Sequence, residues 1–389
     1  MRAATARGVE AIDADAVRAT ASTASGAATR APRVWLLMAH RAGDDTQVQA
    51  LGEALGWPYD VKRFVYRSYE RILNLPFTAT LAGVVASESS ALAPPWPDLV
   101  LTAGRRNEPI ARWIKKQSGG RTRLVHIGRP WAALARWDLV VTTPQYRLRQ
   151  GPTVLHNEAP LHRVTRERLE KAALEWGPRV AHLPRPYVAV LAGGPSGPYP
   201  FDAESGARLA RQASELAARR GGSLLVTTSA RTPAATIQAL FAGVRVPAML
   251  YRWRRDDNDN PFYGFLALAD AIVVTADSVS MMTEACATGR PVYFYDTGEG
   301  KTSMRVPPAP PSAPNAFWRH FSTAYLKAFV YRQAMKLGRT RLTRDIRIVQ
   351  RLLVESGRAA WLGEGEPPPN PPPLGDVERA AARVRALFA

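Results

Sequence analysis

Cysteine, lysine and long apolar runs are scarce in this sequence of 389 residues, and each shortage excludes a class of protein. The single cysteine, Cys286, excludes an internal disulfide and a cysteine-based metal cluster. No apolar run reaches the length of about 18 residues that crosses a bilayer, and residues 1–32 lack the apolar centre of a secretory signal. We therefore expect a cytoplasmic protein, with attachment to the surface of the inner membrane as the alternative.

Acidic residues are also few, with 33 against 52 basic residues and a formal net charge of +19. Only seven of the basic residues are lysines, and an arginine bias of this kind also follows from genomic base composition. The charge requires an acidic partner, which is nucleic acid, an anionic membrane surface or a phosphorylated small molecule. Nucleic acid ranks last, because the sequence contains no RNA- or DNA-reading motif and no basic stripe with regularly spaced aromatics.

Apolar segments of strand length alternate with helical segments along most of the chain. The expected strands lie within residues 33–40, 98–104, 122–128, 137–143, 187–194, 223–229, 248–253, 271–276 and 291–295, and the expected helices span 46–55, 108–117, 203–219, 233–241 and a short segment after Asp277. Continuous apolar strands separated by helices are typical of parallel sheets covered on both faces. The sequence therefore predicts the α/β class, with two Rossmann-like doubly wound domains that face each other across a cleft.

The same alternation predicts the domain boundaries. We expect a disordered tail (1–32), an N-terminal acceptor-side domain (33–180), a C-terminal nucleotide-binding domain (181–315), helices that return to the first domain (316–361), and a Pro-rich linker with a terminal helix (362–389). A mobile tail is expected because its Ala, Thr, Ser and Arg residues show no steady period.

Small, glycine and arginine residues recur in the loops that follow the strands, where doubly wound sheets bind their ligands. The candidates are His40, Gly43, Asp44, Asp45 and Gln47 after the first strand, Arg105 and Arg106 after the next, and Gly193, Gly194, Ser196, Ser229 and Arg231 in the second domain. Glycine lets backbone amides approach an oxyanion, and arginine offers paired donors to phosphate. Turn formation alone explains any single loop, but their recurrence at one edge favours a phosphate-bearing ligand.

The stretch VVTADSVSMMTEACATGRPVYFYD, residues 273–296, places small polar residues between a buried strand and a helix. If Ser278 caps this helix, the amides of Val279, Ser280 and Met281 point into the cleft and hold a diphosphate. Glu284 lies four residues beyond Ser280, about 6 Å along the helix axis, which suits a carboxylate that accepts from a ribose diol. The alternative is an ordinary strand–turn–helix with a solvated glutamate.

These segments resemble a known family. The stretch NPFYGFLALADAIVVTADSVSMMTEACATGRPVYFY, with RVWLLMAHRAGDDTQ, AGRR and TTSARTP, is similar to the mitochondrial fission protein family named after the plant elongated-mitochondria protein, as in its bacterial members. The resemblance covers roughly residues 33–330. The family is in turn similar to GT-B glycosyltransferases, which hold a nucleotide sugar between two Rossmann-like domains. This sequence departs from the family pattern at Gln145 and Tyr146, where many members carry a His-Asp pair.

The resemblance implies a donor and a set of binding residues. It implies a nucleoside-diphosphate sugar as donor substrate, of the UDP type, with no cofactor and no metal. By position, Gly193, Gly194, Ser278, Ser280, Met281 and Glu284 match the nucleotide-binding pattern, and Ser196, Ser229 and Arg231 lie in the adjoining loops.

Sugar transfer also requires a base on the N-terminal side of the cleft. Asp44 is the first candidate, ahead of Asp45 and His40, although helix capping explains Asp44 equally well. Arg231 and the helix amides would stabilise the departing diphosphate. Gly43, Gln47, Arg105 and Arg106 are expected to bind the acceptor or the donor phosphate.

Metal sites and partners beyond the donor are weakly marked. Asp257 and Asp259 have the spacing of metal-dependent sugar transferases but lie among arginines, so a solvated turn is expected instead. Residues 62–77 and 327–351 carry basic and apolar side chains that would dock an anionic membrane or a lipid-linked acceptor. Two alternatives to a glycosyltransferase remain, a non-catalytic membrane-associated scaffold of the same fold and a nucleic-acid binder.

Overall fold

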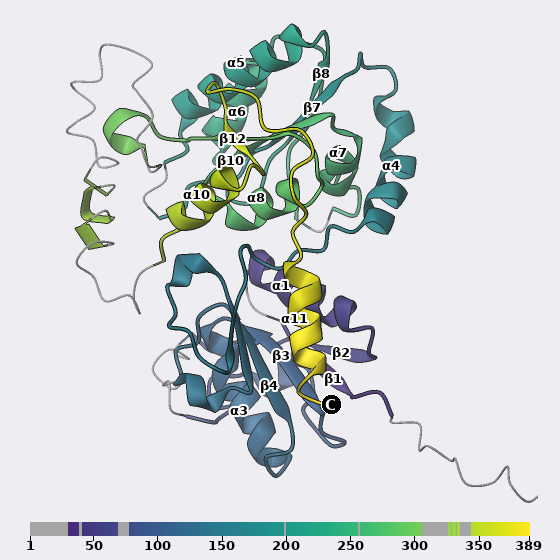
Figure 1. Cartoon of the computed structure of the whole chain (residues 1–389), viewed down its shortest axis with the longest axis vertical. Coiled ribbons are helices and arrows are strands. Elements are labelled where there is room, and N and C mark those ends of the chain that lie inside the picture. The colour runs from purple at the N-terminus through teal and green to yellow at the C-terminus, as the bar shows by residue number, and fades with distance from the viewer. Residues whose placement is uncertain are drawn as a thin grey trace, which may run out of the picture.

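The computed structural model describes most of the chain and divides it into two domains stacked end to end (Figure 1). The described residues are 30–38, 41–68, 78–197, 200–255, 257–303, 305, 326, 327, 329–331, 333, 334 and 344–389. Of the predictions above, His40, most of the tail, part of the basic segment 62–77 and part of the segments 316–361 and 327–351 lie outside these ranges.

The first domain is built on a six-stranded parallel sheet with the strand order β2-β1-β3-β4-β5-β6. Its strands are β1 (Val34–Leu37), β2 (Tyr59–Lys62), β3 (Leu99–Ala103), β4 (Arg123–Ile127), β5 (Leu139–Thr142) and β6 (Val154–His156). Helix α1 (Ala42–Leu55) packs on one face and α3 (Glu108–Gln117) on the other. The sequence predicted α3 with the bounds that the structure has, whereas α1 begins four residues earlier than expected.

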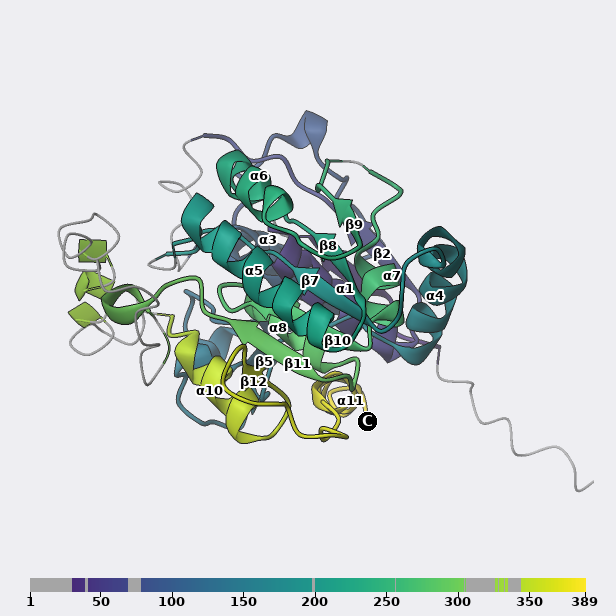
Figure 2. The same cartoon turned by 90° about the horizontal axis from the view of Figure 1, so that it is seen from above.

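The second domain contains another six-stranded parallel sheet, in the order β12-β11-β10-β7-β8-β9. Its strands are β7 (Tyr187–Leu191), β8 (Ser223–Thr227), β9 (Ala248–Tyr251), β10 (Ala271–Thr275), β11 (Val292–Tyr295) and β12 (Ala360–Trp361). Helices α5 (Ala203–Arg219) and α6 (Ala234–Ala242) cover one face, and α7 (Phe262–Leu268), α8 (Val279–Cys286) and α10 (Arg347–Glu355) cover the other. Figure 2 shows these helices on either side of the sheet.

Each sheet contains one point where neighbouring strands send their chains to opposite faces. In the second domain the order is that of the Rossmann fold, and the reversal falls between β7, which leads to α5, and β10, which leads to α8. In the first domain it falls between β1 and β3. Ligands of doubly wound sheets bind at such points, so the topology marks two sites before any side chain is considered.

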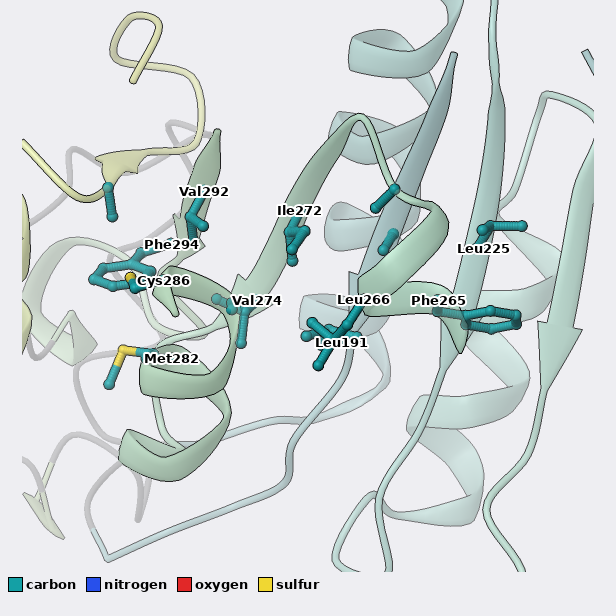
Figure 3. Packing of buried hydrophobic residues seen from close by; sticks show 14 of the residues in the cluster. Leu191, Leu225, Phe265, Leu266, Ile272, Val274, Met282, Cys286, Val292 and Phe294 are labelled. Atoms are coloured by element: carbon teal, nitrogen blue, oxygen red, sulfur yellow. The ribbon is translucent and has the colours of Figure 1, made fainter. Parts of the chain in front are cut away.

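The core of the second domain explains why its strands are easy to recognise in the sequence. Ile272, Val274 and Phe294 pack against Met282 and Cys286 of α8 on one face of the sheet (Figure 3). The alternate residues Ala271 and Val273 pack against α5 and α6 on the other face. Because both faces are covered, each of these strands is buried throughout and almost entirely apolar. Full burial of one such side chain stabilises the fold by about 1.5–3 kcal/mol.

Two helices connect the domains in ways that the sequence did not show. Helix α4 (Arg166–Val180) lies within the stretch that the sequence assigned to the first domain, but its Trp176 and Val180 pack into the core of the second. Helix α11 (Asp376–Arg385) crosses back and packs on α1 of the first domain through Val377 and Val384 (Figure 1). Among the described helices α11 returns to the first domain, and most of residues 316–343, where the expectation placed this role, lies outside the described ranges.

The structure confirms the α/β class and the two doubly wound domains. Strands β2, β6 and β12 and helix α4 were not predicted, whereas α5 has the predicted bounds. Across the described ranges, every helix is too short or too polar to cross a bilayer.

Candidate functional site

The two ligand-binding edges meet between the domains. Gly43 in the first turn of α1 follows β1, and Ser280 in the first turn of α8 follows β10. A Cβ atom added to Gly43 would lie 2.9 Å from the Oγ atom of Ser280, closer than real Cβ contacts, so α1 and α8 approach each other closely here. The loops after the carboxyl ends of both sheets therefore face each other, and a ligand between them would contact both domains.

The loop after β7 packs tightly on the loop after β10. A Cβ atom at Gly193 would collide with Asp277 and Thr275, and one at Gly194 would collide with the backbone of Arg231. The amide of Gly193 donates to Thr275 Oγ1 at 2.8 Å, and the amide of Gly194 donates to Asp277 Oδ2 at 3.1 Å. Both amides are thus bonded to side chains of the β10 strand and loop.

Asp277 is the buried anion of this edge. It is 3% exposed, and the Arg231 guanidinium donates to its Oδ2 atom at 3.2 Å. Burial raises the pKa of Asp277, while hydrogen bonds from Thr275 and Gly194 and the charge of Arg231 oppose the rise. Its Oδ1 atom is buried without a hydrogen-bond partner in the part of the chain that the structure describes. Asp277 therefore joins three loops at the reversal point of the sheet.

The loop after β8 positions Arg231 through its own hydroxyl groups. The amide of Ser229 donates to Thr232 Oγ1 at 2.9 Å, and the amide of Arg231 donates to Ser229 Oγ at 3.3 Å. The Thr232 hydroxyl donates to the carbonyl oxygens of Ala192 and Gly193. Ser229 thus shapes the turn that carries Arg231, while Ser196 lies half-buried further along the β7 loop.

The N-terminus of α8 differs from the expected one in a single respect. Ser278 is its N-cap residue with extended backbone, but its side chain makes no capping hydrogen bond. The first amides of a helix have no acceptor within the helix. The side chain of Ser278 does not supply one to the amides of Val279, Ser280 and Met281. Met281 packs partly on the core. The helix end therefore offers its amides and partial positive charge to the space between the domains.

Glu284 lies one turn further along α8 and is 7% exposed. Burial raises the pKa of its carboxyl group to about 7, against a hydrogen bond from Tyr263 and the charge of Arg163. Arg163 precedes α4 and also donates to Gln49 and Glu53 of α1, so this carboxyl group lies beside a network that links the domains. It is a buried, interdomain carboxyl group, which differs from the solvated glutamate of the alternative interpretation.

Asp44 and Asp45 lie in the first turn of α1, where Arg41 is the N-cap residue. Asp44 is therefore the third helical residue and does not cap the helix. Gln47 donates to the carbonyl oxygen of Gly43 at 3.2 Å, which turns its amide back along the helix.

A basic cavity of about 300 Å³ opens at the carboxyl edge of the first sheet, beside Asp44. Its lining comes from the loops after β1, β3, β4 and β5 and from the segment before α10: Arg41, Asp44, Gly104, Arg105, Arg106, Ile127, Arg129, Trp131, Tyr146 and Arg344. Five guanidinium groups thus surround one carboxylate. The cavity lies at the β1–β3 reversal point, as the fold predicts for a ligand site.

Aromatic rings orient four arginines of this edge. Arg105 lies 4.7 Å from the ring centroid of Trp131, and Arg106 lies 5.3 Å from that of Tyr66. Arg129 and Arg344 flank Tyr146 at 5.9 and 5.6 Å. Contacts of this kind hold guanidinium planes in place and leave their edges as donors.

Buried polar residues fix the loops behind the cavity. Glu108 is 1% exposed and accepts from the amides of Trp131 and Ala132 at 2.7 and 2.8 Å. Asn107 donates to the carbonyl oxygens of Leu37 and Met38, which ties the β3 loop to the end of β1. The cavity is therefore a fixed structure, held by hydrogen bonds from residues that do not line it.

Sequence reasoning found Asp44, Arg105 and Arg106 but missed the other arginines of the cavity. Arg129 could have been identified from the sequence, since GRPW lies at the end of a predicted strand, as the other candidate loops do. Arg344 could not, because it joins the cavity from a distant part of the chain. Tyr146 was noted only as a departure from the family pattern, and it now lies between two arginines.

No group of three or more potential metal ligands occurs among the described residues. Asp257 accepts a hydrogen bond from the Tyr251 hydroxyl at 2.8 Å and from the amide of Asp259, and Asp259 is paired with Arg179. Both carboxylates are engaged within a charged turn, in agreement with the sequence interpretation.

The chain is similar to proteins of known name. A family model described as "Mitochondrial fission ELM1" matches residues 42–306. Mitochondrial fission protein ELM1 of Arabidopsis thaliana is 31% identical over 240 residues, which cover 55% of this chain, and the match spans 55% of that curated relative's length.

Solved structures with a similar arrangement share little sequence. The ADP-heptose LPS heptosyltransferase II of E. coli is 13% identical with a TM-score of 0.40, over 68% of this chain and 84% of that one. A UDP-GlcNAc 2-epimerase from Neisseria meningitidis, bound to UDP-GlcNAc, is also 13% identical with a TM-score of 0.40, over 83% and 98%.

Proposed function

The chain belongs to the mitochondrial fission ELM1 family, and we propose that it is a metal-independent glycosyltransferase that uses a nucleoside-diphosphate sugar. The observation that carries the proposal is the N-terminus of α8, which has no side-chain cap and lies at the Rossmann reversal point facing the other domain. A diphosphate there would accept hydrogen bonds from the amides of Val279, Ser280 and Met281 and interact favourably with the helix dipole.

The residues around this helix end assign a place to each part of the donor. Arg231 lies beside the diphosphate position and would stabilise the charge that develops on the leaving group. The Glu284 carboxylate would accept hydrogen bonds from the ribose hydroxyls. These bonds would replace the hydrogen bonds to water that the carboxylate loses through burial. Gly193, Gly194, Ser196 and Ser229 shape the floor of the site. The base would be of the uridine type, as the family resemblance implies.

The transfer step requires a base on the first domain. Asp44 lines the cavity of the first domain, and we assign it the role of taking the proton from an acceptor hydroxyl, with Asp45 and His40 as the runners-up. The acceptor oxygen then bonds to the anomeric carbon, the bond from that carbon to the diphosphate oxygen breaks, and the nucleoside diphosphate leaves with the electron pair. Gly43 and Gln47 would line the acceptor side.

Thermal unfolding with a panel of nucleoside diphosphates tests the donor site. At concentrations about a hundredfold above Kd, binding stabilises the protein by about 2.7 kcal/mol, so UDP or another member of the panel should raise Tm by a few degrees. Glu284→Ala should weaken the binding of this ligand at least about tenfold, since the substitution removes a charged hydrogen-bond acceptor. Glu215→Ala, on the exposed side of α5, is the matched control and should bind as the wild type does. A panel without any stabilising member contradicts the proposal.

A second candidate function is a scaffold of the same fold without catalysis, associated with an anionic membrane. One observation favours it: Asp277, an anion of the chain itself, already occupies the amide of Gly194 and one side of Arg231. Release of nucleoside diphosphate from a nucleotide sugar separates the two functions. A glycosyltransferase loses this turnover in Asp44→Asn and keeps nucleotide binding, whereas a scaffold shows neither activity.

A further inference from the structure

The arginine cavity of the first domain presents more positive charge than its own carboxylate can balance. Five guanidinium groups and the single carboxylate of Asp44 line about 300 Å³. Within the described ranges, Arg41, Arg105 and Arg344 form no salt bridge. Like charges so close together repel, and an anion between them would remove this repulsion.

The shape of the cavity restricts that anion. A volume of about 300 Å³ is at the lower end of the range for small-molecule pockets, which suits a compact group and not a nucleic-acid strand. Guanidinium groups pair with phosphate oxygens through two parallel hydrogen bonds. The rings of Trp131 and Tyr146 hold three of these groups in place, so little side-chain entropy is lost when a phosphate binds.

We propose that this cavity binds a phosphate or diphosphate group of the acceptor substrate, which makes the acceptor a phosphorylated molecule. The inference rests on the proposed transfer reaction only in naming the ligand an acceptor, since the basic cavity is present whatever the reaction. Asp44, the proposed base, lines the same cavity as Arg105 and Arg106. An acceptor anchored there by its phosphate would present a neighbouring hydroxyl to Asp44 and to the donor site on the other domain.

Arg344 gives the cavity a second structural source. It directly precedes Asp345, whose amide donates to the carbonyl oxygen of Gln145 at 2.9 Å, next to Tyr146. The segment that leads into α10 of the second domain therefore contributes to a pocket of the first. A bound phosphate would connect the two domains through Arg344, close to the reacting groups.

Calorimetric titration with inorganic pyrophosphate, in the presence of saturating nucleoside diphosphate, tests the proposal. The same titration without nucleotide shows the total binding, and the cavity variants below separate the arginine cavity from the donor site. The wild type should bind pyrophosphate, and Arg105→Gln should weaken this binding about tenfold to a hundredfold, since one charge-assisted pair is lost. Arg344→Gln should act in the same direction. The Arg344 side chain is exposed, so Arg344→Gln should fold even if Arg105→Gln does not.

Arg121→Gln is the matched control, because it removes the same charge from an exposed site at the amino end of β4. The proposal is overturned if the wild type binds no pyrophosphate with or without nucleotide, or if all three variants lose the same affinity. Failure of the donor site is a separate result: a protein that binds pyrophosphate in the cavity but no nucleotide refutes the transfer reaction and retains the anion site.

Two sources would supply the phosphate, a soluble ester or a lipid headgroup. Glycerol 3-phosphate represents the first, and phosphatidylcholine vesicles that contain phosphatidic acid represent the second. If the protein sediments with these vesicles, and Arg344→Gln reduces this sedimentation whereas Arg121→Gln does not, the acceptor is lipid-linked. Binding of the soluble ester alone, with the same dependence on Arg344, identifies a soluble one. A protein that binds neither source contradicts the proposal.

Discussion

Positive groups gather at the reversal points of both sheets, and the two domains balance this charge in opposite ways. In the second domain the positive groups of the edge, the Gly194 amide and the Arg231 guanidinium, contact a buried carboxylate of the chain, Asp277. In the first domain the positive groups are five arginines around an open cavity with one carboxylate. One edge carries its own anion, and the other is built to receive one.

The difference shows what similar topology leaves open. Parallel strands bring loops and helix N-termini to one edge in both domains, so both edges attract anions. Whether an internal or an external anion satisfies them depends on single side chains that follow the strands. Asp277 fixes the geometry of the proposed donor site, which leaves the first amides of α8 for the proposed ligand. The cavity arginines are instead held by aromatic rings, and Glu108 behind them accepts from the backbone amide of Trp131.

Removal of the internal anion of the second edge should have the largest effect. Asp277→Ala leaves the Gly194 amide without its acceptor and Arg231 without its partner, so we expect a loss of about 2–3 kcal/mol in the free energy of unfolding. Asp277→Asn, which keeps an acceptor oxygen, should recover about half of this. Urea denaturation measures both variants. Asp259→Ala, at an exposed pair with Arg179, is the control and should change stability by less than about 0.5 kcal/mol.

Inorganic phosphate sharpens this test. With Asp277 removed, the second edge resembles the first, and phosphate should restore part of the stability of Asp277→Ala. If Asp277→Ala is as stable as the wild type, the carboxylate does not organise the edge, and the contrast between the domains is lost.

Glu284 predicts a pH dependence of the stability of the second domain. Burial raises its pKa to about 7, from 4.5 in the unfolded chain, so the native state binds the extra proton between these values. The free energy of unfolding therefore falls as pH rises from about 5 to 7, by about 1–3 kcal/mol for this group. Glu284→Gln should remove this slope. Nucleotide affinity should rise over the same range, because the ribose hydroxyls donate to the ionised form.

Urea denaturation at several pH values, with and without nucleotide, measures both effects of Glu284. The variant Glu284→Gln provides the control for both effects, since an amide does not ionise in this range. A wild type whose stability is flat between pH 5 and 7 would show that Glu284 is exposed to solvent and not buried between the domains.

The sequence predicted the parts of this molecule in which burial is uniform. Strands such as β7 and β10 are buried at every position because helices cover both faces, and their largely apolar sequences, in alternation with helices, predicted the class and the two domains. Strand β2 at the edge of its sheet has the sequence YDVK and is mostly exposed, so its pattern gives no such signal. Helix α4 was missed within a segment interpreted as a connection, where Gly177 and Pro178 interrupt its pattern.

The site was predictable only as far as topology places loops together. The rule that ligands bind after the carboxyl ends of strands correctly brought Gly193, Arg231 and Ser280 to one edge. The sequence could not show that Asp277 takes the Gly194 amide, since that depends on how closely two glycines let the loops approach. Nor could it place Arg344 beside Tyr146, because nearly 200 residues separate them and only tertiary folding brings them together.

The smallest expected effect concerns the contact at which the two edges meet. In Gly43→Ala the new methyl group would lie 2.9 Å from Ser280 Oγ, so the serine must rotate at a cost of about 0.5–1.5 kcal/mol. Alanine in a helix gains about 0.5–1 kcal/mol over glycine, and the two effects should nearly cancel in urea denaturation. In a Ser280→Ala background the clash is absent, so the same substitution should be stabilising by up to about 1 kcal/mol. A double-mutant cycle thus predicts a coupling of about 0.5–1 kcal/mol. A coupling of zero would mean that α1 and α8 do not touch in solution, and that the donor edge and the arginine cavity are not parts of one site.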